Sequence, residues 1–259
     1  MKKIIYLIFL ISFSLTAQQK SDYEYAKHIS GNDTLNYRIL KPKDFDKNKK
    51  YPLLLFMHGS GERGSDNQAQ LKHGSSLFTE AANRENFKAF VVFPQCPTGD
   101  YWASITYSNE GEGLGFGFNK QGPPQKSLKM VLGLMDQLVK NPNVDPSRIY
   151  VMGLSMGGMA TYELLQRRPE LFAAAIPICG GANLENAGLY AKNTPVWIFH
   201  GTDDRVIHPK YSIEIAQAIN EAGGSPRLNL YDNTGHDSWT RAFAEPDFLS
   251  WLFSHKKAD

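Results

Sequence analysis

The feature that most constrains this chain is the stretch over residues 148–158, which reads Arg-Ile-Tyr-Val-Met-Gly-Leu-Ser-Met-Gly-Gly. A β-branched and aromatic run enters the pattern Gly-x-Ser-x-Gly, and a helix-compatible segment follows it. This order predicts a sharp strand-to-helix turn that presents Ser155, with Gly153 and Gly157 where a Cβ would clash. The N–H of Met156 would then face an oxyanion formed at the serine, aided by the helix dipole. An ordinary glycine-rich turn is the alternative.

Apolar runs and helical patterns alternate through most of the chain. Extended segments at residues 24–30 and 34–40 flank Gly31-Asn32-Asp33, which is typical of a β-hairpin. Besides the strand before Ser155, the predicted strands lie at residues 53–57, 89–93, 173–178, 196–199 and 227–231. The predicted helices lie at residues 67–86, 127–140, 158–168, 211–222 and 248–254. After the N-terminal hairpin, this alternation predicts an α/β domain with a mainly parallel, doubly wound sheet.

The composition favours a single domain and argues against one class of partner. With 259 residues and 42% hydrophobic content, the chain can bury one large core. Its net charge is +2, and without Lys2 and Lys3 the chain has 26 basic and 26 acidic side chains. This balance gives no electrostatic basis for nucleic-acid binding.

The first residues have the three parts of a secretory signal peptide. Met1-Lys2-Lys3 precedes an apolar run over residues 4–15, and Thr16-Ala17 precedes a polar segment. The apolar run is shorter than the ~20 residues of a membrane-spanning helix, although a membrane anchor is the alternative. We therefore expect a signal peptide over residues 1–17, a mature domain over residues 18–259 without a membrane span, and a periplasmic or secreted location.

Loops at the carboxyl ends of the predicted strands carry the candidate reactive side chains. Such loops share one edge of a parallel sheet, and they contain Ser155, Asp203-Asp204 and His236. A serine hydroxyl needs a neutral imidazole to take its proton, and the imidazole needs a carboxylate to fix its tautomer. Ser155 is the candidate nucleophile and His236 the candidate base. Either Asp203 or Asp204 is the candidate acid, because only one of two neighbours can face the histidine.

Two other patterns in the sequence bear on cofactor binding. Residues 99–124 interleave aromatic residues with six glycines and show no helical or strand period, so we expect an irregular loop there. The glycines do not match Gly-x-Gly-x-x-Gly after a buried strand, which argues against dinucleotide binding. His58, His200 and His208 lack the Cys or Glu spacing of a zinc site, so we expect no metal and interpret them as local hydrogen-bonding residues.

With these residues in place, the chain resembles the α/β-hydrolase superfamily over nearly all of its mature sequence. It is similar to secreted esterases near the dienelactone hydrolases, the phospholipase/carboxylesterases and the polyhydroxybutyrate-depolymerase-type feruloyl or acetyl xylan esterases. The motifs that carry the resemblance are His58-Gly59-Ser60-Gly61-Glu62-Arg63-Gly64, Pro94-Gln95-Cys96-Pro97 with Trp102, Val144-Asp145-Pro146-Ser147-Arg148-Ile149-Tyr150, Gly153-Leu154-Ser155-Met156-Gly157-Gly158, Pro177-Ile178-Cys179-Gly180-Gly181, His200-Gly201-Thr202-Asp203-Asp204 and Gly235-His236-Asp237-Ser238-Trp239.

The resemblance implies an α/β-hydrolase fold and a serine esterase that forms an acyl-enzyme without a metal or organic cofactor. By the family's Gly-x-x-Asp pattern, counted from Gly201, the acid is Asp204. The implied substrates are small-molecule or polysaccharide-linked esters, including acetyl or feruloyl esters of plant polysaccharides. A serine peptidase of the prolyl-oligopeptidase type and a non-catalytic binding protein on the same fold are the alternatives.

The resemblance also implies roles for three further residues. The backbone N–H groups of Ser60 and Met156 become the two oxyanion donors. Trp102 lies near the serine in the family, where its ring would form a flat wall for an aromatic acyl group or a sugar ring. Packing of this ring into the domain is the alternative.

Two cysteines, Cys96 and Cys179, are predicted not to pair despite export. Each follows a buried strand, and in the strand order that the resemblance implies two other strands separate them. Three spacings of ~4.8 Å amount to roughly 14 Å, which exceeds the ~7 Å limit between the Cα atoms of a disulfide. We therefore expect two free thiols.

Overall fold

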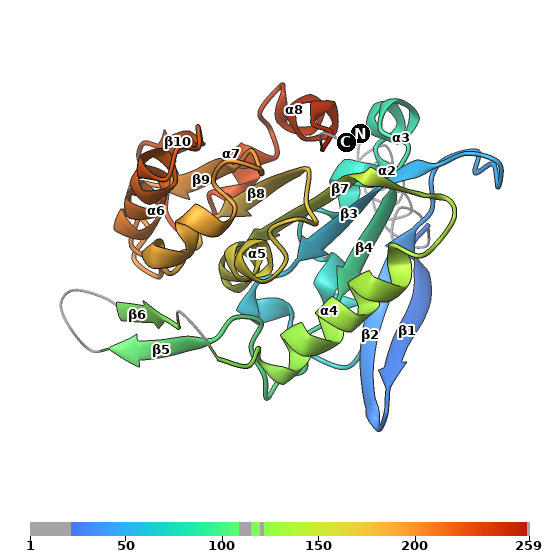
Figure 1. Ribbon diagram of the computed structural model, residues 1–259, viewed down its shortest axis with the longest axis horizontal. Coiled ribbons are helices and arrows are strands. Elements are labelled where there is room, and N and C mark those ends of the chain that lie inside the picture. Colours follow the sequence, from blue (N-terminus) through green and yellow to red (C-terminus); the bar gives the residue numbers. More distant parts are fainter. Residues whose placement is uncertain (1–21, 109–114, 120–121, 258–259) are drawn as a thin grey trace, which may run out of the picture.

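One mixed sheet forms the centre of the protein, as the computed structural model shows for residues 22–108, 115–119 and 122–257 (Figure 1). The signal peptide predicted over residues 1–17 lies outside these described residues. The strands of the sheet are β1 (Glu24–Ser30), β2 (Asp33–Leu40), β3 (Tyr51–Met57), β4 (Phe90–Pro94), β7 (Val144–Leu154), β8 (Ala174–Ile178), β9 (Trp197–Gly201) and β10 (Arg227–Tyr231).

The strand order is β1-β2-β4-β3-β7-β8-β9-β10. The hairpin β1–β2 and the pair β2–β4 are antiparallel, and every later pair is parallel. The predicted doubly wound α/β sheet with an N-terminal hairpin is therefore confirmed. β7, the strand that precedes Ser155, lies in the interior of the sheet between β3 and β8.

Side chains alternate between the two faces of the sheet and build a core on each. Along β3, Leu53 and Leu55 belong to one core, and Leu54 and Phe56 belong to the other. The first core is completed by the helices α4 (Lys126–Leu138), α5 (Met156–Arg167) and α6 (Lys210–Glu221). The second is completed by α2 (Ser75–Thr79), α7 (Trp239–Ala242) and α8 (Phe248–Ser254). Burial on both faces explains why β3 reads as a continuous apolar run.

The single helix predicted over residues 67–86 is wrong. The segment contains a 3₁₀ turn at Ala69–Leu71, then α2, then α3 (Ala81–Asn86). Gly74 has φ +79°, and a Cβ there would lie 2.5 Å from the Phe56 ring, so the chain turns at the one residue type that fits. Glu80 lies between α2 and α3, and its extended ψ of 134° ends α2.

The loop predicted over residues 99–124 contains regular structure. An antiparallel pair, β5 (Ile105–Ser108) and β6 (Gly115–Phe118), projects beside α5 (Figure 1). Phe116 anchors the pair, because it clusters with Met159 of α5 and with Ile207. The expectation of an irregular loop is therefore wrong for these strands, which are short and follow no apolar run.

The two cysteines stand where the strand order predicts. Cys96 follows β4 and Cys179 follows β8, and β3 and β7 separate those strands. Both thiols are free and buried. Within the described residues, no helix combines the length and apolar character needed to cross a bilayer.

Candidate active site

Ser155 occupies a strained turn between β7 and α5. Its φ of 55° and ψ of −119° are rare for a residue with a Cβ, and such strain is concentrated at functional sites. A Cβ on Gly157 would lie 1.9 Å from the Met57 carbonyl oxygen, and one on Gly153 would lie 2.4 Å from the Gly157 carbonyl oxygen. Both glycines are thus required by close backbone approach. The predicted strand–turn–helix arrangement is confirmed.

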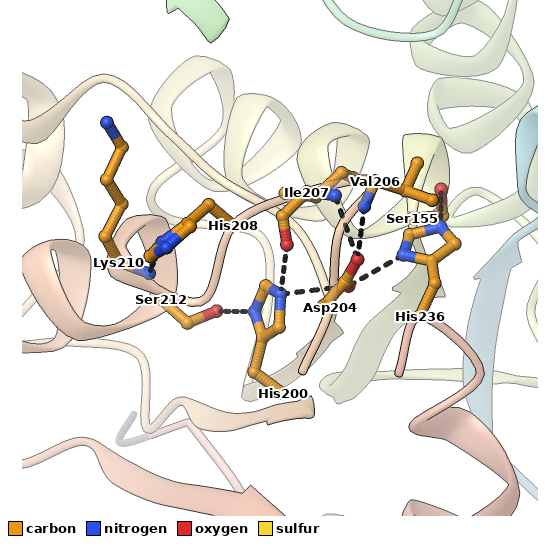
Figure 2. A network of polar contacts seen from close by, with 9 residues as sticks. All are labelled: Ser155, His200, Asp204, Val206, Ile207, His208, Lys210, Ser212 and His236. Carbon is orange, nitrogen blue, oxygen red and sulfur yellow. Dashed lines mark hydrogen bonds and ion pairs between the residues drawn. The ribbon is translucent and has the colours of Figure 1, made fainter. Parts of the chain in front are cut away.

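A continuous hydrogen-bonded chain joins Ser155, His236 and Asp204 (Figure 2). The Ser155 hydroxyl lies 2.9 Å from His236 Nε2, and His236 Nδ1 lies 2.7 Å from Asp204 Oδ2. A carboxylate only accepts, so Nδ1 carries the proton and Nε2 is left to accept from the serine. The three side chains come from loops after β7, β9 and β10. The sequence-predicted residues are therefore brought together in hydrogen-bonding order.

Asp204, not Asp203, is the carboxylate that faces His236. Its side chain is fully buried, and Oδ1 accepts hydrogen bonds from the backbone N–H groups of Val206 at 2.8 Å and Ile207 at 3.0 Å. Burial acts to raise the pKa of Asp204, but the donors around it outweigh burial and hold that pKa well below its usual range. Asp203 is exposed and accepts from the Thr202 hydroxyl.

His200 is a second imidazole on the same carboxylate (Figure 2). Its Nε2 lies 2.8 Å from the Ile207 carbonyl oxygen and 3.2 Å from Asp204 Oδ2. Because both partners are acceptors, Nε2 is protonated, and Nδ1 accepts from the Ser212 hydroxyl at 2.7 Å. His200 was predicted to be a local hydrogen-bonding residue, but its link to the acid was missed. The signal available in the sequence was the spacing of four residues between His200 and Asp204.

The two predicted oxyanion donors begin helical turns next to the serine. Met156 is the first residue of α5, and Ser60 is the first residue of a 3₁₀ turn (Ser60–Glu62), so neither N–H has a partner within its helix. A Cβ built on Gly59 would lie 3.6 Å from Ser155 Cβ, which places this loop against the serine. Arg63 fixes the Ser60 peptide, because its Nε donates to the Ser60 carbonyl oxygen at 3.0 Å.

His58 fixes the start of the same loop from within the core. It is 2% exposed, its Nδ1 donates to the Gly59 carbonyl oxygen at 2.6 Å, and its Nε2 accepts the N–H of Cys96 at 3.0 Å. Both ring nitrogens are thereby used by a neutral imidazole. Burial lowers the pKa of His58 to about 4.

The acid stability of the protein should depend on His58. Because the pKa of His58 is about 4 in the folded protein and near 6.5 in the unfolded chain, the unfolded chain binds more protons between these values. The resulting stability is complete above pH 6.5 and is lost as pH falls toward 4, by about 3 kcal/mol. Urea unfolding between pH 4 and 8 measures it. In the variant His58→Asn, the free energy of unfolding should fall less steeply as pH falls. His208→Asn changes an exposed histidine and should keep the wild-type dependence on pH. The same dependence on pH in all three proteins would contradict the role assigned to His58.

The prediction that Trp102 faces the substrate is wrong. Its side chain has no exposed surface and packs in the core beneath the loop that contains Ser60. The indole Nε1 donates to the His58 carbonyl oxygen at 3.2 Å, and the ring meets the His58 ring edge to face at 5.2 Å. Trp102 therefore supports the loop from below.

Replacing Trp102 with alanine should mainly destabilise the fold. Removal of a fully buried tryptophan typically costs about 3–5 kcal/mol, which in a protein of this size lowers the melting temperature by about 6–20 °C. Thermal unfolding followed by circular dichroism measures the change. Tyr107→Ala is the matched control, because Tyr107 belongs to the same segment and is 59% exposed. If Trp102→Ala had the melting temperature of the wild type, the Trp102 ring would not be part of the core.

Comparison with known proteins gives a family match and several similar proteins. Residues 44–250 match the sequence profile of the phospholipase/carboxylesterase family. A bifunctional acetylxylan esterase/xylanase of Neocallimastix patriciarum is 30% identical over 157 residues, which cover 61% of this chain and 20% of that protein. Dipeptidyl-peptidase 5 of Porphyromonas gingivalis is 29% identical over 177 residues, which cover 66% of this chain and 22% of that protein. The chain thus spans about a fifth of the length of these two relatives.

A solved structure agrees with the family match. The crystal structure of a thermostable esterase superposes with a TM-score of 0.82 at 31% identity, covering 93% of this chain and 64% of that one. The family match extends over well more than half of the chain and includes Ser155, Asp204 and His236. The chain therefore belongs to the phospholipase/carboxylesterase family and has the α/β-hydrolase fold that its sequence predicts.

Proposed function

We propose that this protein is a serine hydrolase that cleaves carboxylic esters through an acyl-enzyme. The observation that carries the proposal is the hydrogen-bonded chain from Ser155 through His236 to Asp204, with contacts of 2.9 Å and 2.7 Å. The Asp204 carboxylate accepts from His236 Nδ1–H and so holds the tautomer that the reaction needs. The similarity to an acetylxylan esterase and to a thermostable esterase supports the same chemistry.

The reaction follows from these contacts. Ser155 Oγ attacks the ester carbonyl carbon while its proton passes to His236 Nε2, and Asp204 stabilises the imidazolium that forms. The carbonyl oxygen becomes an anion, which the N–H groups of Met156 and Ser60 stabilise. Collapse of this intermediate expels the alcohol, which takes the proton from His236. Water then cleaves the acyl-enzyme by the same steps and regenerates the serine.

An aromatic wall on the leaving-group side supports esters of sugars as substrates. The departing oxygen must lie next to His236, because this ring protonates it. Trp239 meets the His236 ring edge to face at 5.5 Å and is partly exposed, and the His73 ring lies 5.2 Å from Trp239. The exposed part of such an indole suits the apolar face of a sugar ring. We therefore propose acetyl or feruloyl esters of plant polysaccharides as substrates, with Trp239 in the role first predicted for Trp102.

A serine peptidase is the second candidate. The similarity to dipeptidyl-peptidase 5 favours it, since the same three side chains serve both reactions. An amide, however, has a poorer leaving group, which must be protonated as it departs. The ratio of ester to amide turnover separates the two functions.

One panel assay tests the proposal. Purified protein should hydrolyse acetylated xylan, feruloyl esters and p-nitrophenyl acyl esters faster than peptide amides, and a fluorophosphonate probe should label Ser155. Ser155→Ala should lose both the activity and the label. Faster turnover of peptide amides would establish the peptidase. Absence of labelling together with absence of hydrolysis would indicate a non-catalytic binding protein.

We also propose that the protein is exported by the leader over residues 1–17. The positive start, the apolar run and Thr16-Ala17 support this location. The intact mass of protein recovered outside the cytoplasm should correspond to cleavage near Ala17. An uncut chain in that fraction would indicate the membrane-anchor alternative.

A further inference from the structure

A thiol that the proposed reaction does not use lies beside its acid and base. The ligand-capable atoms of Cys179, Asp204 and His236 all lie within 4.8 Å of one another. Cys179 is fully buried, and the side chain of His236 is 21% exposed, so the group is reached from the surface through the histidine. We propose that these three side chains form a latent site for a thiophilic divalent cation, Zn²⁺ or Cd²⁺, and that binding there inhibits hydrolysis.

The backbone holds Cys179 in this position. Its N–H donates to the Phe199 carbonyl oxygen at 2.8 Å, and its φ of 41° is unusual for a residue with a side chain. The next residue, Gly180, packs against α5 so closely that a Cβ on it would lie 2.6 Å from the Gly158 carbonyl carbon. Because the chain on both sides of Cys179 is fixed, its thiol stays beside the acid and the base.

A buried hydroxyl next to the thiol provides an independent indication of a ligand. Ser238 is fully buried, and its hydroxyl borders the Cys179 thiol. Among the residues that the structure describes, this hydroxyl oxygen has no hydrogen-bond partner that meets ordinary geometry. A buried polar atom without a partner is unfavourable, and such atoms in native proteins call for an explanation.

The donor set selects the class of cation. One sulfur, one imidazole nitrogen and one carboxylate oxygen suit Zn²⁺ and Cd²⁺, whereas Mg²⁺ and Ca²⁺ prefer oxygen alone. Tetrahedral zinc with bonds of about 2.0–2.3 Å separates its ligand atoms by about 3.5 Å. The widest separation here, at most 4.8 Å, must therefore shrink by at most about 1.3 Å. His236 is the partly exposed member and can move, while Asp204 stays fixed by His200 and by two backbone N–H groups.

Cation binding disables the base His236 by taking the place of two protons. The cation replaces the proton of the Cys179 thiol and the proton on His236 Nδ1, and both protons leave to solvent. The cation then bridges His236 Nδ1 and the Asp204 carboxylate in place of their direct hydrogen bond. A positive ion on one ring nitrogen lowers the basicity of the other, so Nε2 no longer accepts the Ser155 proton effectively. Removal of the cation by a chelator restores the original hydrogen bonds.

Zinc inhibition of the tag-free mature protein tests the site. Wild type and Cys96→Ser should lose ester hydrolysis at the same Zn²⁺ concentration, because Cys96 is a buried thiol outside this group. Cys179→Ser should need at least about tenfold more Zn²⁺, and EDTA should restore wild-type activity. Equal sensitivity of wild type and Cys179→Ser would overturn the proposal.

A second measurement does not depend on catalysis. Ser155→Ala should bind one Cd²⁺ per chain by equilibrium dialysis and show the ultraviolet absorption of a cadmium–thiolate bond. The double variant Ser155→Ala with Cys179→Ala should show neither signal, and Ser155→Ala with Cys96→Ser should show both. Binding that survives loss of Cys179, or that disappears with Cys96 alone, would refute the site whatever substrate the enzyme uses. If Cys179→Ser fails to fold, Cys179→Ala and Cys179→Val replace it in both assays.

Discussion

Ester hydrolysis falls by about 10⁴-fold or more when Ser155 is replaced with alanine, if the proposed acyl-enzyme forms there. The residues of a nucleophile–base–acid set act as a unit, so loss of the nucleophile removes nearly all the benefit of the other two. The remaining rate would come from the Met156 and Ser60 N–H groups and from substrate binding. The value of kcat/KM for a p-nitrophenyl ester measures this loss.

The fold should be unaffected by the same substitution. The elbow is held by backbone contacts, including the Ser155 N–H bond to the Ile178 carbonyl oxygen at 2.9 Å, and alanine keeps them. The side-chain hydroxyl contributes its bond to His236. We therefore expect a melting temperature close to that of wild type. Activity within tenfold of wild type, in a variant that melts normally, would place the nucleophile elsewhere.

Replacing Asp204 with asparagine should reduce kcat by about 10⁴-fold, on the precedent of other serine hydrolases whose orienting aspartate is changed to an amide. An amide presents only one acceptor oxygen, whereas the carboxylate receives donors from His236, His200 and two backbone N–H groups. The amide NH₂ would oppose the Nδ1–H of His236 and favour the tautomer that cannot take the serine proton. Turnover of a p-nitrophenyl ester, measured well below the melting temperature, checks the expectation.

Asp203→Asn is the matched control, because it makes the same chemical change one residue away. Asp203 is exposed and bonds the Thr202 hydroxyl, so its loss should change kcat by no more than a few fold. Should Asp203→Asn prove the more damaging of the two, the orienting acid would be Asp203 and the buried carboxylate would have a structural role.

Local pattern was enough to predict the centre of the fold. The strand, the Gly-x-Ser-x-Gly pattern and the helix around Ser155 follow one another in the sequence, so the turn is recognisable locally, although the backbone that requires Gly157 is that of Met57 in the neighbouring strand β3. The apolar runs gave the parallel strands for a similar reason, since burial on both faces excludes polar residues. Ser155 and His236 share one edge of the sheet because both follow the carboxyl ends of parallel strands. These parts needed no knowledge of long-range side-chain contacts.

The errors arose where contacts between distant residues decide the structure. Trp102 lies in a segment whose composition indicates an exposed loop. Its indole is nevertheless buried and donates a hydrogen bond to the His58 carbonyl oxygen. Gly74 breaks a helical pattern because it packs on Phe56, which belongs to a strand of the sheet. The acid was not such an error, because the family pattern counted from Gly201 gave Asp204, but the residue types alone left Asp203 and Asp204 open and burial decides between them.

The strand order places the nucleophile and the base at mechanically unequal positions in the sheet. Ser155 follows β7 in the interior of the sheet, whereas His236 follows β10, which pairs with β9 alone at the outer edge. Edge elements open at lower free energy than interior ones. Fraying of β10 would carry the imidazole away from a nucleophile whose surroundings remain native. Under mild denaturant, the chemistry and the fold of this protein are therefore separable, and enzymatic inactivation reports the integrity of one border of the sheet.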